Sequence, residues 1–162
     1  MLPSPPTVSS QWTRRGEGMS EILKLHSLLM SGEITSEELT NKYLDAVEKE
    51  NPSVNAFVNV TREKALLGAR NADERIRKGE NAGVLTGIPM SLKDNICTKG
   101  SETTCASKIL SGHKPIYDAT VWKKLESEGA VLLGKTNMDE FAMGSTCENS
   151  RFGETKNPID TN

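Results

Sequence analysis

The segment Gly87-Ile88-Pro89-Met90-Ser91-Leu92-Lys93-Asp94-Asn95 decides how the rest of the chain is organised. Its largely apolar residues 88–92 follow a glycine and end at a Lys-Asp-Asn sequence, a pattern typical of a buried strand that leads into a polar loop. Such a strand brings Lys93 to the carboxyl end of a sheet, where open α/β folds bind their ligands. We therefore expect Lys93 at the rim of an apolar layer, where burial disfavours the charged amine and suits it to proton transfer.

The residues that follow predict a strand–helix–strand unit. A long polar segment, 95–115, separates the first strand from a helix over 118–128, and the apolar run 130–134 is typical of a buried parallel strand. The segment 135–145 is expected to begin as a turn and to continue as a short helix. For the helix over 118–128 we expect an N-cap at Asp118 and an inward face formed by Val121, Trp122 and Leu125.

The residues before this unit predict two paired helices, a strand and a third helix. Apolar spacing indicates a helix over 20–31, and Thr35-Ser36-Glu37-Glu38 has the pattern of a capping box at the start of a second helix. We expect the second helix to end before Asn51-Pro52, because a proline disfavours the helical conformation of its predecessor. A strand over 55–60 and a helix over 62–78 complete the α/β prediction: a helical preface, then a mixed or parallel sheet flanked by helices.

Composition narrows the classes of function. The chain has 162 residues, 26% of them charged, with a net charge of −2 and scattered Lys and Arg, so it offers no basic nucleic-acid surface and no membrane span. Cys97, Cys105 and Cys147 are an odd number in a chain large enough to fold without disulfides, which favours free thiols in a reducing compartment. Residues 1–18, rich in Pro and Ser, are interpreted as a disordered leader or a start-site artefact, with Met19 as the true start.

Several chemistries compete for these residues. A lysine at a strand end can simply be solvated, and a kinase-type lysine is disfavoured because no glycine-rich phosphate loop precedes Lys93. A Schiff-base lysine remains open, although no phosphate-binding partner for a pyridoxal cofactor is evident. Cys97, Cys105 and His113 lack the spacing of a zinc site, so no metal is expected. Ser145 and Ser150 are candidate hydroxyls, and Asp139-Glu140 is expected at a helix start.

Three separate segments, in order, resemble the amidase signature family. They are Gly87-Ile88-Pro89 leading to Lys93-Asp94-Asn95, then Thr103-Thr104-Cys105-Ala106-Ser107, and then residues 134–144, which read Gly-Lys-Thr-Asn-Met-Asp-Glu-Phe-Ala-Met-Gly. The resemblance runs from about Ser20 to the end of the sequence, so residues 19–162 are expected to be the N-terminal portion of a single amidase signature domain. It is strongest for family members that supply ammonia to tRNA-dependent amidotransferases.

The resemblance implies a Ser–cis-Ser–Lys triad in which Lys93 is the lysine, and it places Met143, Gly144 and Ser145 beside the substrate amide. It implies a glutaminase that passes ammonia to a B subunit, which uses ATP and Mg to convert Glu-tRNA(Gln) to Gln-tRNA(Gln). A C subunit would clamp the pair, and the tRNA would be contacted mainly through the B subunit. The chain itself would need no cofactor and would be cytoplasmic.

The resemblance places both serines in a Gly/Ser-rich stretch shortly after Asn157-Pro158, and the sequence ends at Asn162 before that stretch. Residues 1–162 alone are therefore expected to be inactive. Two alternatives remain open at this point: another amidase-signature hydrolase that acts on small amides without tRNA, or a non-catalytic remnant that serves as an interaction module.

Overall fold

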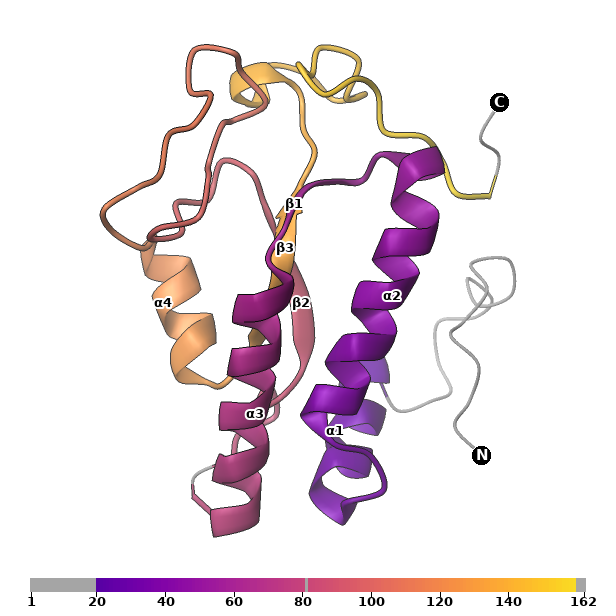
Figure 1. Ribbon diagram of the computed structural model, residues 1–162, viewed down its shortest axis with the longest axis vertical. Coiled ribbons are helices and arrows are strands. Elements are labelled where there is room, and N and C mark those ends of the chain that lie inside the picture. Colours follow the sequence, from indigo (N-terminus) through magenta and orange to yellow (C-terminus); the bar gives the residue numbers. More distant parts are fainter. Residues whose placement is uncertain (1–19, 81, 160–162) are drawn as a thin grey trace.

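A three-stranded mixed sheet lies at the centre of the computed structural model, which describes residues 20–80 and 82–159 (Figure 1). The strands are β1 (Phe57–Val60), β2 (Pro89–Lys93) and β3 (Val131–Thr136), in the spatial order β1-β3-β2. β2 and β3 run parallel, whereas β1 is antiparallel to β3. The predicted α/β class is confirmed, and so is the parallel pairing of the two strands in the strand–helix–strand unit. The expectations for residues 1–18 lie outside the described residues.

Two helices precede the sheet, as predicted. They are α1 (Glu21–Ser31) and α2 (Ser36–Val54). The capping box is present: the Glu38 backbone N–H donates to the Thr35 hydroxyl, and the Thr35 N–H donates to the Glu38 carboxylate. Such a cap contributes about 1 kcal/mol.

The prediction that α2 ends before Asn51-Pro52 is wrong, because the helix includes Pro52 and continues to Val54. The Asn51 side chain donates to the Phe57 carbonyl at 2.9 Å and accepts from the Phe57 N–H at 2.7 Å. These bonds join the last turn of α2 to the first residue of β1. Tertiary contacts of this kind outweigh the weak local preference against a helical residue before proline.

One face of the sheet is covered by α2 and α3 (Arg62–Lys78). Ala65 and Ala69 of α3 are buried against Val131 and Leu133, and these small side chains allow close approach of helix and strand. A Cβ added to Gly134 would lie 2.2 Å from the Asn59 carbonyl oxygen, so only glycine fits where β1 crosses this part of β3. The predicted helix over 62–78 is confirmed.

The other face is covered by α4 (Thr120–Ser127), which Figure 1 shows across the sheet from α2. Trp122 packs with Leu92 and Leu132, and residues 131–133 alternate between the two faces as strand geometry requires.

Two details of the prediction for this helix are wrong. Val121 is 50% exposed instead of facing inward, and Asp118 does not cap the helix, because its carboxylate accepts the backbone N–H of Lys99 at 2.7 Å.

The segment after the apolar run also differs from the prediction. Residues 135 and 136 are not a turn, because β3 continues through Thr136 with Leu92 opposite Lys135 and Lys93 opposite Thr136. The helix expected afterwards is a single 3-10 turn, η1 (Glu140–Ala142), in which Phe141 has a φ of 51°. The backbone N–H groups of Glu140 and Phe141 donate to the carbonyls of Asn149 and Cys105, which lie in neighbouring loops.

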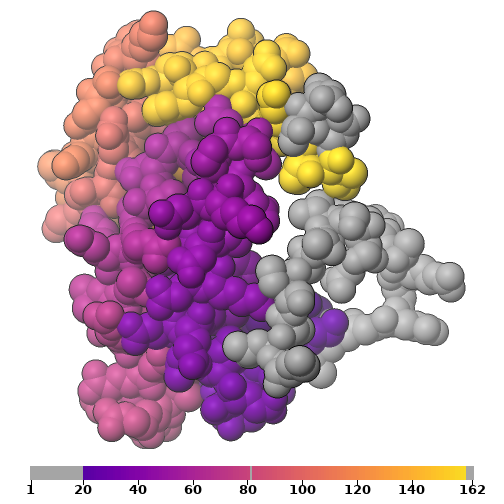
Figure 2. Space-filling view, turned by 45° about the vertical axis from the view of Figure 1, so that its right-hand side comes forward, coloured from indigo at the N-terminus to yellow at the C-terminus, as the bar shows by residue number. Residues whose placement is uncertain are grey.

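The last described segment lies across the end of α2, as Figure 2 shows for the yellow residues beside the purple helix. The Lys156 N–H donates to the Val54 carbonyl at 2.8 Å, and the Asn55 side chain donates to the Phe152 carbonyl at 2.8 Å. These bonds fix the segment that follows the 3-10 turn. None of the helices in the part of the chain that the structure describes has the length and apolar character of a membrane span.

Candidate active site

Lys93 is the last residue of β2, so it lies at the carboxyl end of the parallel strand pair as predicted. Leu92, the residue before it, is 5% exposed and belongs to the apolar layer with Trp122. The Lys93 side chain is exposed, so the burial that we expected for this amine is not provided by the described residues. Its amine is therefore open to a ligand or to further chain at this edge of the sheet.

The buried lysine at this edge is Lys135, which sequence analysis did not select. Its side chain is 0% exposed, and its ammonium donates to the Ile96 carbonyl at 2.5 Å and to the Thr103 hydroxyl at 3.1 Å. Burial lowers the pKa of Lys135, and the nearby Asp94 carboxylate opposes that effect. Its position directly after the apolar run 130–134 was the available signal, since such runs form parallel strands that are buried on both faces.

Asp94 follows Lys93 and is also buried, with 1% exposure. Its Oδ2 accepts the Thr104 hydroxyl at 2.6 Å and the Thr104 backbone N–H at 3.0 Å. Its backbone N–H donates to the Thr136 carbonyl at 3.0 Å. Asp94 therefore joins the ends of β2 and β3 to the buried loop 103–107.

Asp139 organises the loop that follows η1. Its two carboxylate oxygens accept the backbone N–H groups of Cys147 at 2.9 Å and of Asn149 at 3.0 Å. These backbone donors hold the pKa of Asp139 below its ordinary value, and the positive charge of Lys93 adds a smaller effect in the same direction. The predicted helix start is confirmed in position, because η1 begins at Glu140 with Asp139 as its N-cap residue, although the Asp139 side chain makes no cap hydrogen bond.

The three predicted substrate-binding residues lie in the loop that Asp139 holds. Met143 is 81% exposed, and Gly144 and Ser145 are exposed as well. The structure thus brings the 143–145 segment to the carboxyl ends of β2 and β3, where the charge of Lys93 acts on Asp139 and the Asp139 carboxylate lies against Gly144. Ser150, the other candidate hydroxyl, donates to the Asn137 side chain at 2.6 Å and so has a structural partner.

A second link joins this loop to the segment 103–107. The Ser107 hydroxyl donates to the Glu140 carboxylate at 2.5 Å, and the Phe141 N–H donates to the Cys105 carbonyl at 3.0 Å.

The three cysteines are free thiols, and burial raises the pKa of Cys105. Within residues 20–80 and 82–159 no three His, Cys, Asp or Glu side chains gather in a way that could hold a metal ion.

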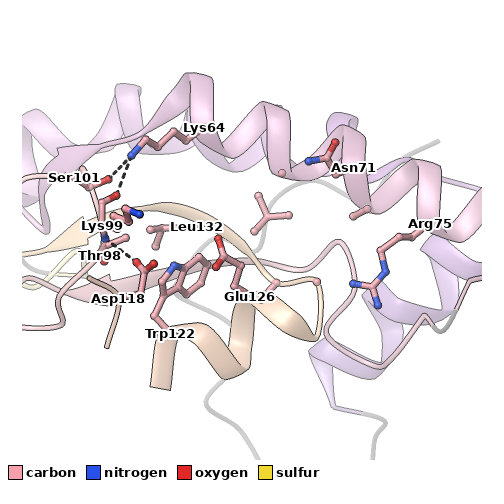
Figure 3. A pocket seen from close by; sticks show the side chains of 15 residues that line it. Lys64, Asn71, Arg75, Thr98, Lys99, Ser101, Asp118, Trp122, Glu126 and Leu132 are labelled. Atoms are coloured by element: carbon pink, nitrogen blue, oxygen red, sulfur yellow. Dashed lines mark hydrogen bonds between the residues drawn. The ribbon is translucent and has the colours of Figure 1, made fainter. Parts of the chain in front are cut away.

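A separate cavity of about 400 Å³, which Lys93 does not line, lies between α3 and α4 (Figure 3). Its polar lining contains both signs of charge, and Lys64 donates to the Ser101 hydroxyl at 3.0 Å across one end. Neither Lys93 nor the 143–145 segment lines it. The cavity is therefore separate from the candidate active site at the strand ends.

Comparison with known proteins shows which proteins this chain resembles in sequence and in structure. The chain is 50% identical over 140 residues to the A subunit of glutamyl-tRNA(Gln) amidotransferase from Thermosynechococcus vestitus, covering 86% of this chain and 29% of that protein. Peptide amidase from Stenotrophomonas maltophilia has a similar structure, with a TM-score of 0.80 and 33% identity over 88% of this chain and 30% of that one. The chain spans less than a third of the length of these two proteins.

The solved structure of the A subunit of glutamyl-tRNA(Gln) amidotransferase from Thermotoga maritima also matches, with a TM-score of 0.63 and 40% identity over 78% of this chain and 25% of that chain. The sequence profile of the family described as amidase matches residues 38–162, which include all the strands, Lys93 and the loop that Asp139 holds. This chain therefore belongs to the amidase family.

Proposed function

We propose that the protein is the glutaminase subunit of a glutamyl-tRNA(Gln) amidotransferase and that Lys93 is its catalytic base. The observation that carries the proposal is the position of Lys93. It ends β2, an outer strand of the three-stranded sheet that runs parallel to β3, and it is exposed. Its positive charge acts on Asp139, whose carboxylate lies against Gly144 in the loop that contains Met143, Gly144 and Ser145. The 50% identity to the A subunit of such an enzyme supports glutamine as the substrate.

In the proposed reaction a neutral Lys93 takes a proton through a bridging serine, and a second serine attacks the amide carbon of glutamine. Ammonia leaves, an acyl-enzyme forms, and water releases glutamate. The resemblance to the amidase signature family places both serines in the stretch after Asn157-Pro158. An ordinary lysine is less than about one part in a thousand neutral at pH 7, so the site must disfavour the charged amine for this base to work.

The partners are part of the same proposal. Ammonia passes to a B subunit that uses ATP and Mg to activate Glu-tRNA(Gln), and a C subunit holds the glutaminase and the B subunit together in the cytoplasm. The lysines and arginines of this chain are scattered, which supports contact with the tRNA mainly through the B subunit.

The test is reconstitution of the full-length protein with its B and C subunits. We expect glutamine-dependent formation of Gln-tRNA(Gln), and we expect Lys93→Met to abolish release of ammonia from glutamine. Exposed Lys123 on α4 supplies a matched control, since Lys123→Met removes a charge outside the site. Full activity of Lys93→Met would refute the assignment of Lys93.

A partner-independent amide hydrolase is the second candidate. It is favoured by the TM-score with peptide amidase, 0.80, which exceeds the 0.63 found with the Thermotoga protein. Assays of the full-length protein without partners distinguish the two. Hydrolysis of peptide amides in preference to glutamine, and no association with B and C subunits, would favour this second function.

A further inference from the structure

Two opposite charges are completely buried next to the candidate base. Asp94 is 1% exposed and Lys135 is 0% exposed, and their closest charged atoms, Oδ1 and Nζ, are 3.9 Å apart. Burying an ion typically costs several kcal/mol, and a buried pair is often no more stabilising than apolar side chains of the same size. Stability alone is therefore a weak explanation for this pair.

The positions of the two residues relate them directly to Lys93. Asp94 is the next residue in the chain, and Lys135 lies opposite Leu92 in the parallel register. Lys135 is hydrogen bonded to the carbonyl of Ile96 and to the hydroxyl of Thr103, so it joins the turn that follows Lys93 to the loop that contains Thr103. Any shift of Lys135 therefore changes the path of the chain at the end of β2.

The charges of the pair are only partly satisfied by hydrogen bonds. Asp94 Oδ1 accepts no hydrogen bond, and the positive charge that lies near it is Lys135. The titratable thiols of Cys97 and Cys105 also act electrostatically on Lys135, and Asp139 is the further charged group that interacts with Lys93. Without Lys135, the buried charge at the end of β2, directly after Lys93, would be more negative by one unit.

We propose that Lys135 is a positioning residue for Lys93, and that with Asp94 it forms a neutral buried pair that fixes the end of β2 and leaves no unbalanced buried charge there. This inference rests on the proposed role of Lys93 in glutamine hydrolysis. Neither Lys135 nor Asp94 transfers a proton to the substrate in this account.

The experiment measures kcat/KM for glutamine hydrolysis against pH in the full-length protein with its partners. Lys135→Met leaves Asp94 unpaired, and the added negative charge favours a protonated Lys93. The rising limb of the profile should therefore move to higher pH by roughly one unit, a typical effect of one nearby charge. Asp94→Asn combined with Lys135→Met should return the limb to its wild-type position, and Lys123→Met should leave it unchanged.

A Lys135→Met variant that loses activity at every pH without moving the limb would overturn the proposal, because a purely structural role predicts that result. If Lys135→Met does not fold, Asp94→Asn alone is measured. It retains an acceptor for Thr104 and leaves Lys135 as the unpaired charge, so a limb moved to lower pH supports the proposal and an unmoved limb overturns it. Failure of the proposed function itself would look different: wild-type protein inactive on glutamine, or Lys93→Met fully active.

Discussion

The carboxylate of Asp139 occupies the space beside Gly144 where a side chain would otherwise lie. A Cβ added to Gly144 would be 2.4 Å from Cγ of Asp139, closer than real Cβ contacts permit. The same carboxylate accepts the N–H groups of Cys147 and Asn149. The shape of the 143–149 loop therefore depends on a glycine and a carboxylate that fit together.

Gly144→Ala should displace this loop and weaken the binding of glutamine. We expect KM for glutamine to rise about ten-fold or more, because even small displacements of positioning groups are costly for catalysis. Gly68→Ala is the control: its Cβ would make only ordinary contacts, 3.9 Å from the Val131 side chain, and alanine favours the helix by roughly 0.5–1 kcal/mol. An unchanged KM in Gly144→Ala would contradict the assignment of this loop to the substrate.

Asp139→Asn should change how stability depends on pH. Because the folded state lowers the pKa of Asp139, its ionised form stabilises the fold above the unfolded value of 3.8, and this contribution is lost as the pH falls through the lower folded value. The difference in melting temperature between wild type and Asp139→Asn should therefore be largest near neutral pH and should become smaller as the pH falls. Thermal melts of both proteins across this range check the prediction, and a difference that grows in acid would contradict it.

Trp122→Ala should be strongly destabilising, whereas Val121→Ala should change stability little. Trp122 is 5% exposed and packs on Leu92 and Leu132, and removal of such a side chain costs about 3–5 kcal/mol. Val121, its neighbour on α4, is 50% exposed. Denaturant unfolding of the two variants in the full-length protein measures the contrast. Equal losses in both would mean that α4 packs through a different face.

Much of the fold could be predicted from local signals. The parallel pairing of β2 and β3 followed from two apolar runs around a helix, and the start of α2 followed from the Thr35–Glu38 capping box. The end of α2 could not be predicted in the same way, because contacts between Asn51 and Phe57 extend the helix past Pro52. Asp118 does not cap α4 for a related reason. Its carboxylate binds the backbone N–H of Lys99, which lies 19 residues earlier in the chain and is brought near only by the fold.

The candidate site was predictable only in part. Lys93 was found because it ends an apolar run, and the 143–145 segment was found through the family resemblance. Lys135 was missed because a charged residue after an apolar run usually marks a turn. Here its acceptors are Ile96 and Thr103, which only the fold brings near, and that is why the lysine is buried inside β3.

The central claim is that Lys93 is the base of a glutaminase, and the most direct measurement is ammonia release from glutamine by the full-length Lys93→Met protein. Its side chain is exposed, so the variant should fold and melt like wild type. We predict a loss of at least about 100-fold in kcat, the scale of a general base, with Lys123→Met unaffected. A Lys93→Met variant that melts normally and releases ammonia at the wild-type rate would contradict the claim.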